Sequence, residues 1–493
     1  MPTSGRRIDD EAIDDATARL LARRSREPRD DVANRSQNVR LKCDMSLIPA
    51  ATRRPVFVYI DQARVALSRS RQTAHSPCNY HYCQYLRCPC PLNLVVIAGA
   101  PSTAAPLRPE TRQMPFDWTQ EQYATRARFR DIGAEIAAAV EQDGRTPAEF
   151  DEAGWTRLGH EGLWDMIVPD TYGGDGHGWW HFSAALEGLA SSIRRPALLL
   201  SVIAQAGMVR ALERHGTAAQ QDRYFGAILR GELSATAIAE PGTGTDVRSI
   251  ATTLAEHGDG YRLTGSKFNI AHAPLARFIL VVTRIETPGR RNTALVIVDR
   301  DQPGMTVSPP DRKLGLEDLP TGALHFDDCP ITRGQLLGEP GAGLGNLIDI
   351  ISLGRLYYGL VAAQVTTPYL RDAIGYCRER RSFDSTIDAH QYVQRRLVDL
   401  QIGIERGTWL ARGALAQLLT DHPQALMTCS IAKLVGAQDL VDGAIGLVRL
   451  YGSLGYQAGP VAAFAADALG FMSVGGTEEM HRKNIFNQMM RAG

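Results

Sequence analysis

Residues 237–249 read AIAEPGTGTDVRS, in which a short apolar stretch leads directly into a glycine-rich loop. Gly242 and Gly244 allow backbone amides to approach a phosphate or a thioester chain closely. Thr243 and Thr245 add hydroxyl groups to the same loop. Because a plain β-turn can have the same composition, the stretch by itself leaves a tight turn and a ligand-binding loop equally open.

The hydrophobic period changes on either side of this loop. Helical spacing precedes it and returns after residue 341, whereas the intervening sequence is β-rich and bounded by Gly, Pro and Asp. We predict an α+β fold with an N-terminal helical domain (114–233), a middle antiparallel β domain (234–340) and a C-terminal four-helix bundle (341–493). The expected helices cover 119–141, 147–160, 179–192, 196–214, 345–380, 388–419, 424–451 and 477–491, and one more begins after Gly216.

The overall charge and hydropathy exclude several classes of protein. Lys+Arg and Asp+Glu both total 54, so the chain has no net field that would attract nucleic acid. No apolar run approaches the roughly 18 residues of a membrane-spanning helix. Acidic residues such as Asp9, Asp10 and Glu11 come too early for a transit peptide. We therefore expect a cytoplasmic protein with no nucleic-acid partner and no membrane span.

Residues 1–113 differ in composition from the remainder. They hold 18 Lys+Arg against 11 Asp+Glu, and five of the eight cysteines. Cys88 and Cys90 are too closely spaced for a usual zinc knuckle, and no second Cys/His pair has finger-like spacing, so we expect no metal site. The segment also lacks a sustained helical or strand period. We interpret it as a disordered or artefactual leader, with the folded protein starting at Met114.

Five stretches together resemble the acyl-CoA dehydrogenase family. The loop at 237–249 is similar to the family signature, in which a Glu-Pro pair is followed by Gly, Ser/Thr and Asp. The other four agree in order and spacing: FDWTQEQ (116–122), RKLGLEDLPTGALHFDDCPI (312–331), RERRSFDSTIDAHQ (378–391), and YGSLGY (451–456) followed by GGTEEMHR (475–482). The resemblance covers about residues 114–493. It implies FAD as cofactor, an acyl-CoA or acyl-carrier-protein substrate, a flavin electron acceptor or reductase, and a homotetramer or homodimer, with a heteromer possible.

The resemblance also assigns expected roles to individual residues. In this family the flavin accepts a hydride from the β-carbon of an acyl thioester while a carboxylate removes the α-proton. Thr245 and Arg355 match positions that face the substrate. The positions expected to contact FAD are Ile238, Thr245, Asn269, Ala271, Arg380, Phe383, His390, Gln391, Gly452, Gly476 and Thr477.

Some of these positions depart from the family pattern. Asn269 replaces the tryptophan that stacks on the flavin, and Ala271 replaces a hydroxyl that bonds its N5 edge. The catalytic glutamate of many members corresponds to Gly475, and the alternative location used by others corresponds to Gly354. We call 354 and 475 the two base positions. Other candidates for an acid or a base are Asp349, Glu478, Glu479, His272, Tyr357 and Tyr358.

Three functions are consistent with this pattern. The first is an FAD-dependent oxidoreductase that dehydrogenates an acyl thioester, which the retained loop, Thr245 and Arg355 support. The second is a reduced-flavin-dependent monooxygenase on the same fold, for which no α-proton base is needed. The third is a non-catalytic subunit that pairs with an active paralogue, which accounts for lost flavin contacts beside a retained Arg380. The two empty base positions leave the catalytic base unassigned.

Overall fold

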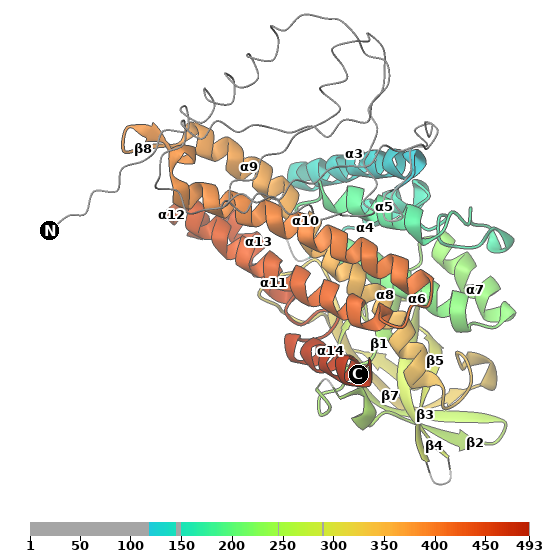
Figure 1. Cartoon of the computed structure of the whole chain (residues 1–493). Coiled ribbons are helices and arrows are strands. Elements are labelled where there is room, and N and C mark those ends of the chain that lie inside the picture. The colour runs from blue at the N-terminus through green and yellow to red at the C-terminus, as the bar shows by residue number, and fades with distance from the viewer. Residues whose placement is uncertain (1–117, 144–148, 245, 288–289, 493) are drawn as a thin grey trace, which may run out of the picture. The chain divides into compact units, whose positions relative to one another are not determined.

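The computed structural model describes residues 118–143, 149–244, 246–287 and 290–492. The chain divides into two units at residues 108 and 109, and the described residues belong to the unit Pro109–Gly493 (Figure 1). The five cysteines of the N-terminal segment and Thr245 lie outside the described residues. The interpretation of residues 1–113 as a leader therefore stays a prediction.

The N-terminal part is helical, as expected. The first helix begins behind a capping box in which Thr119 and Gln122 exchange backbone–side-chain hydrogen bonds of 3.0 and 3.2 Å. Asp151 caps the second helix by accepting from the Gly154 amide at 3.0 Å. The helices are α3 (Gln120–Asp143), α4 (Glu152–His160), α5 (Trp179–Ala190), α6 (Ala197–His215) and α7 (Ala218–Leu229).

The middle part is a seven-stranded sheet. Its strands are β1 (Ser234–Ala237), β2 (Thr253–His257), β3 (Gly260–Ala271), β4 (Phe278–Thr287), β5 (Arg290–Asp299), β6 (Met305–Val307) and β7 (Thr321–Ile331). The strand order is β1-β4-β2-β3-β7-β6, with β5 paired to β4. Most pairs are antiparallel, but β4 pairs in parallel with both β1 and β2. The expected β domain is thus present, and its sheet is mixed rather than purely antiparallel.

The C-terminal part is a helical bundle with more breaks than expected. Its helices are α8 (Gly343–Gln364), α9 (Thr366–Glu379), α10 (Gln391–Leu419), α11 (Ala425–Tyr451), α12 (Ser453–Tyr456), α13 (Pro460–Gly470) and α14 (Glu478–Ala492). A short hairpin, β8 (Arg381–Ser382) and β9 (Ser385–Thr386), joins α9 to α10. The single helix expected over 345–380 is interrupted at Val365, because Pro368 has no N–H to donate to the Gln364 carbonyl.

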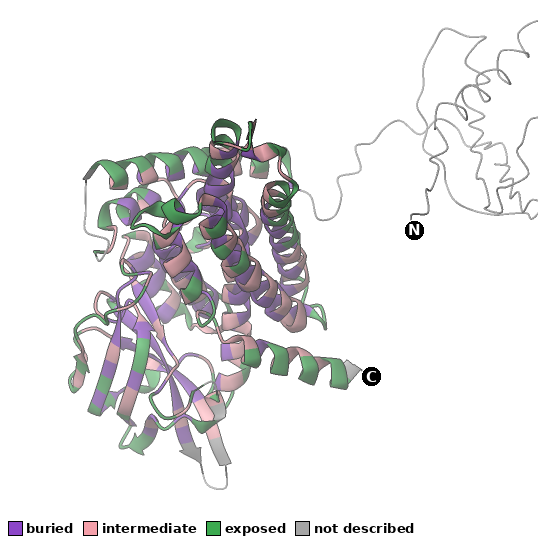
Figure 2. Cartoon of the chain, turned by 90° about the vertical axis from the view of Figure 1, so that its left-hand side faces the viewer, coloured by how far each residue is buried: buried purple, intermediate pink, exposed green. Residues whose placement is uncertain are grey.

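Two apolar cores hold the unit together. Phe278, Leu280 and Val282 of β4 belong to a large core shared with the helices, whereas Ile279 and Val281 belong to a smaller core on the other face of the sheet. This alternation is the period of two of a strand buried on both faces. Figure 2 shows buried residues throughout the bundle and the sheet, while α14 extends away from both with a largely exposed surface. None of the described helices is long and apolar enough to cross a bilayer.

Candidate active site

Glu240 of the 237–249 loop anchors that loop to the sheet. It is 6% exposed and accepts hydrogen bonds from the Ala251 and Thr252 amides at 2.6 and 3.0 Å. The ammonium of Lys267, which is fully buried, donates to Glu240 Oε1 at 2.8 Å and to the Ile238 carbonyl at 3.1 Å. Burial acts to raise the pKa of Glu240, but these hydrogen bonds outweigh it and lower the pKa. Glu240 therefore holds the loop in place and does not face a ligand.

Beyond this anchor, the loop is open to solvent. Gly242 and Gly244 are exposed, and Gly244 has a φ of 53°, a conformation that glycine adopts readily. A Cβ built on either glycine would meet nothing within 4 Å. The loop therefore has room for a ligand on its outer side. The expected contact of Thr245 lies outside the described residues and stays a prediction.

The strand expected to face the flavin carries a bulge at the substituted position. Phe268 and Asn269 of β3 stand opposite the single residue Ala323 of β7. Asn269 is exposed, with a φ of 52°, and Phe268 is 50% exposed. Ala271 and Ile238 are half-buried nearby, at the ends of β3 and β1. Because its backbone is pushed outward, Asn269 presents a short polar side chain where a stacking ring is expected.

Tyr358 lies against both base positions. A Cβ built on Gly475 would lie 2.7 Å from Tyr358 Cε2, and one built on Gly354 would lie 3.6 Å from the same atom. Ile351, Gly354 and Tyr358 follow one another at helical spacing on α8, and all three are half-buried. Burial raises the pKa of Tyr358 to about 12, so its hydroxyl stays protonated at neutral pH. A phenol ring, not a carboxylate, therefore borders the place where the family base is expected.

The candidate carboxylates have other roles. Asp349 accepts from Arg210 at 2.9 Å and lies 3.6 Å from His215. Burial raises the pKa of Asp349, but these two partners outweigh burial and bring it to about 2. Glu478 is paired with Arg482 at 2.6 Å, and Glu479 is exposed in the first turn of α14. Their positions suit stabilisation of the helix N-terminus.

Two other candidate acid–base groups belong to the core. His272 is fully buried, with Nε2 2.8 Å from the Ser201 hydroxyl and Nδ1 3.3 Å from the Ser234 carbonyl. Burial lowers its pKa to about 4. Tyr357 is fully buried, donates to the Trp179 carbonyl at 3.4 Å, and has a pKa raised by burial. Neither side chain has an exposed face that could meet a substrate, and both pack in the core.

Arg355 is buried beside the Gly475–Gly476 loop, which we call the glycine loop. Two further basic residues, which the sequence analysis did not identify as candidates, are buried beside the same loop. Lys433 of α11 donates to the Gly476 carbonyl at 2.6 Å, and His481 of α14 lies 3.2 Å from the Gly475 carbonyl. Thr477 directly precedes α14, and its hydroxyl accepts a hydrogen bond from the Met480 amide at 3.4 Å. The only sequence feature that could have drawn attention to Lys433 is its position as a lysine in a long, mostly apolar helix. No sequence feature predicts its hydrogen bond to Gly476.

The remaining expected cofactor residues gather around the β8–β9 hairpin and the α11–α12 junction. Phe383 and Asp384 form the hairpin turn with φ values of 50° and 66°, and Phe383 is 91% exposed. Glycine adopts such a left-handed φ more readily than aspartate does. His390 lies 3.3 Å from the Ser382 carbonyl, which fixes it against the hairpin. Arg380, Gln391 and Gly452 are exposed in the same region.

The two sets of expected cofactor residues lie at opposite ends of the helical bundle. Figure 1 shows the hairpin β8 with α9 and α12 at one end, and α14 with the sheet at the other. The residues fit the parts of FAD that they are expected to meet, since an exposed guanidinium suits a pyrophosphate and an exposed bulge flanked by half-buried apolar residues suits the flavin.

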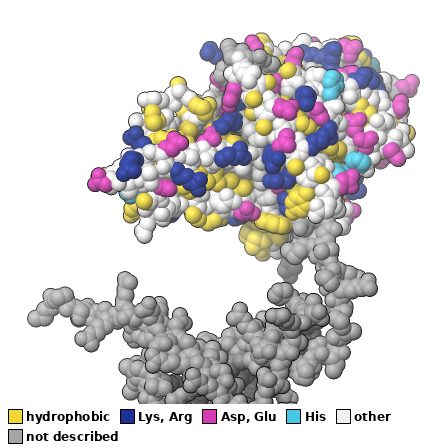
Figure 3. Space-filling view, turned by 90° about the horizontal axis from the view of Figure 1, so that it is seen from above, with side chains coloured by type: hydrophobic (Ala, Val, Ile, Leu, Met, Phe, Trp, Pro, Cys, Tyr) yellow, Lys and Arg dark blue, Asp and Glu magenta, His cyan; other side chains and the backbone are white. Residues whose placement is uncertain are grey.

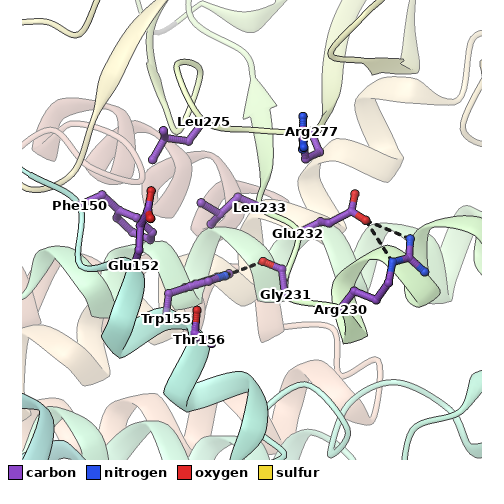
Figure 4. A pocket seen from close by; sticks show the side chains of 10 residues that line it. All are labelled: Phe150, Glu152, Trp155, Thr156, Arg230, Gly231, Glu232, Leu233, Leu275 and Arg277. Atoms are coloured by element: carbon purple, nitrogen blue, oxygen red, sulfur yellow. Dashed lines mark hydrogen bonds and ion pairs between the residues drawn. The ribbon is translucent and has the colours of Figure 1, made fainter.

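Two pockets occur elsewhere on the described surface. One, of about 280 Å³, lies between α4, the α7–β1 link and the turn after β3, where Trp155 donates to the Gly231 carbonyl at 2.8 Å (Figure 4). The other, of about 830 Å³, is lined by residues of α3, α9, α13 and the 314–318 loop. Neither includes a residue of the glycine loop 475–477.

On the face seen in Figure 3, basic and acidic side chains are interspersed over the described surface.

Comparison with known families matches three consecutive segments of the chain. Residues 119–232 match the family described as acyl-CoA dehydrogenase, N-terminal domain. Residues 235–329 match its middle domain, and residues 341–490 match its C-terminal domain. The matched segments begin and end close to the boundaries of the three structural parts.

Individual known proteins are also similar to this chain in sequence or in structure. Benzylmalonyl-CoA dehydrogenase from Aromatoleum aromaticum is 31% identical over 377 residues, which cover 74% of this chain and 97% of that protein. A solved structure described as an FAD-dependent dehydrogenase superposes with a TM-score of 0.70 at 26% identity and covers 76% of this chain and 99% of its own. The prolyl acyl carrier protein oxidase AnaB has the same fold, with a TM-score of 0.71 at 22% identity over 76% of this chain and all of that one.

Proposed function

Because the chain belongs to the acyl-CoA dehydrogenase family, we propose that it is an FAD-dependent oxidoreductase that dehydrogenates an acyl thioester between its α- and β-carbons. The thioester is carried on CoA or on a carrier protein. The single observation that carries the proposal is the loop at 237–249, whose Glu240–Lys267 anchor is intact and whose glycines leave open space on the outer side.

We propose that FAD lies between two copies of the chain. The flavin would be held by Ile238, Asn269, Ala271 and the Gly476–Thr477 loop, and when bound it would supply the hydride acceptor for the substrate. Arg380, Phe383, His390, Gln391 and Gly452 of a second copy would meet the pyrophosphate and the adenosine end. The exposed positions of Arg380, Phe383 and Gln391 support this arrangement. The assembly is a homodimer or homotetramer, and an electron-transferring flavoprotein or a reductase would exchange electrons with it.

Tyr358 would act on the substrate as a hydrogen-bond donor. Its pKa of about 12 makes the phenol a poor proton acceptor at neutral pH, and the two base positions carry no side chain that could serve instead. The absence of a carboxylate there favours a second candidate, a monooxygenase in which reduced flavin and oxygen act on the substrate without removal of an α-proton.

A visible spectrum followed by substrate addition tests the proposal on the full chain. The purified protein is expected to show a flavin band that bleaches when acyl thioesters are added anaerobically. Colour without bleaching, together with substrate-dependent oxygen uptake once a reductase is supplied, would favour the monooxygenase. A colourless protein that takes up FAD only with a paralogue would support a non-catalytic subunit and contradict the proposal.

A further inference from the structure

The bulge in β3 leaves one large apolar side chain exposed. Phe268 is 50% exposed, although β3 lies between β2 and β7 inside the sheet. Among the described residues it is a member of neither apolar core. Scattered exposed apolar residues are common on protein surfaces and need no explanation by themselves. Bulges, by contrast, are frequent beside active sites, where they change the direction in which a side chain points.

Burial along β3 shows which face of the sheet carries Phe268. Lys267 precedes it, is fully buried and pairs with Leu324, a member of the smaller core. Ile270, after the bulge, belongs to the same core. Because side chains alternate between the two faces of a strand, the residues that follow Lys267 and Ile270 both lie on the opposite face. These residues are Phe268 and Ala271, and Ala271 packs against the large core on that face.

The backbone of Phe268 is joined to the 237–249 loop. Its amide donates to the carbonyl of Ala239 at 2.9 Å, one residue after Ile238. Ile238 packs against the large core, as Ala271 does. The Phe268 ring therefore lies on the same side of the sheet as two half-buried residues that are expected to contact the flavin. Phe268 and Asn269 are both exposed, so this place is open to a ligand from solvent.

The backbone of Asn269 accounts for the absence of an aromatic ring at that position. Its φ of 52° lies in the left-handed region, which asparagine adopts more readily than most residues. A bulky ring with this φ would be strained, so a tryptophan at position 269 is poorly compatible with the bulge. Phe268, directly before it, supplies an aromatic ring on the required face without this strain.

We propose that the ring of Phe268 stacks on the flavin, in place of the ring that position 269 lacks. This inference rests on the proposed function, which has the flavin held by Ile238, Asn269 and Ala271. Stacking on a flat heteroaromatic group is favourable for an aromatic side chain, and it would cover the exposed face of Phe268. Phe268 holds the cofactor in position and takes no part in proton transfer.

FAD binding to the full-length apoprotein tests the proposal by calorimetry. Phe268→Ala is expected to weaken FAD binding by about tenfold or more, because the stacking surface is lost. Phe268→Tyr keeps an aromatic ring and should retain the wild-type affinity. Phe486→Ala is the matched control, because Phe486 is a phenylalanine of similar exposure, 60%, on α14. It should bind FAD as the wild type does.

Two further measurements separate stacking from a structural role. The melting temperature of the Phe268→Ala apoprotein should equal that of the wild type, since the ring belongs to neither core. The visible absorption band of FAD bound to Phe268→Ala should move toward that of free FAD, whereas Phe268→Tyr should leave the band in place. Equal FAD affinity in Phe268→Ala and wild type would overturn the proposal. Dissociation of the apoprotein assembly by Phe268→Ala would also overturn it, because the ring would then contact a second copy of the chain.

The outcome can be told apart from a failure of the proposed function. If Phe268→Ala binds FAD normally and acyl thioesters bleach the flavin, dehydrogenation stands and the stacking contact is wrong. If FAD affinity depends on Phe268 but no thioester bleaches the flavin, the stacking contact stands and the dehydrogenase function is wrong.

Discussion

At the scale of single residues, the two glycines at the base positions have different structural requirements. Gly354 lies in the middle of α8, where a Cβ would meet its neighbours at ordinary distances of 3.6 and 3.9 Å. Gly475 has a φ of 70°, and a Cβ there would press into the ring of Tyr358. A carboxylate could therefore be restored at position 354 far more easily than at position 475.

Alanine substitutions at positions 354 and 475 measure how well each position tolerates a side chain. Gly354→Ala should raise the free energy of unfolding by about 0.5–1 kcal/mol, because alanine is the better helix former. Gly475→Ala should lower it by about 1–3 kcal/mol, because the left-handed backbone and the contact with Tyr358 both oppose a side chain. Denaturant unfolding of the two variants supplies the comparison. If Gly475→Ala is as stable as the wild type, Tyr358 does not occupy that space.

His272 makes stability depend on pH. Its folded pKa of about 4 is below the unfolded value near 6.5, so the unfolded state binds protons first as pH falls. The contribution of His272 to the free energy of unfolding is fully present above pH 6.5. It is lost progressively between pH 6.5 and 4, by up to about 3 kcal/mol. Across this pH range, the free energy of unfolding of His272→Gln should fall less steeply than that of the wild type. An identical pH dependence in variant and wild type would contradict the burial of a neutral imidazole.

At the scale of elements, the loop at 237–249 depends on one buried ion pair between β3 and the end of β1. Removing one partner leaves the other charge buried, which typically costs about 3–5 kcal/mol, whereas removing both costs less. Glu240→Ala and Lys267→Met should therefore each destabilise the protein more than the double variant does. A double-mutant cycle measured by denaturant unfolding checks this, and strictly additive effects would show that the pair does not anchor the loop.

Helices and strands could be predicted from the sequence where apolar residues follow a single helical or strand period. The strands of the β domain and the amphipathic helices were recognisable because apolar residues alternate or recur at helical spacing. Helix α13 was missed, because PVAAFAADALG is apolar on most sides and lacks a polar face. The break at Val365 was also missed, although Pro368 signals it, because apolar periodicity continues across it.

The candidate site was predictable only in part. The empty base positions and the altered flavin strand follow from register with the family motifs. The Tyr358 ring, the anchoring role of Glu240 and the cluster of Arg355, Lys433 and His481 could not be predicted. Each of these arises from contacts between segments far apart in the sequence, and no periodicity records such contacts.

At the scale of the whole molecule, the proposed position of FAD between two copies of the chain predicts that FAD binding depends on assembly. Arg380→Ala should weaken FAD binding to the apoprotein by tenfold or more, because a charge-assisted contact to the pyrophosphate is lost. The melting temperature of the apoprotein should not change, since Arg380 is exposed. Arg378→Ala, a change at a neighbouring exposed arginine of α9, is the control. Equal FAD affinity in both variants would contradict the role of Arg380.

The mass of a thioester before and after a single anaerobic turnover tests the central claim most directly. The full-length protein loaded with FAD is mixed with a slight deficit of each acyl-CoA of a panel, and the mass of the recovered thioester is measured by mass spectrometry. Our account predicts a product that has lost two hydrogens, formed in step with bleaching of the flavin. Recovery of every thioester of the panel unchanged from a fully folded, flavin-loaded protein would contradict it.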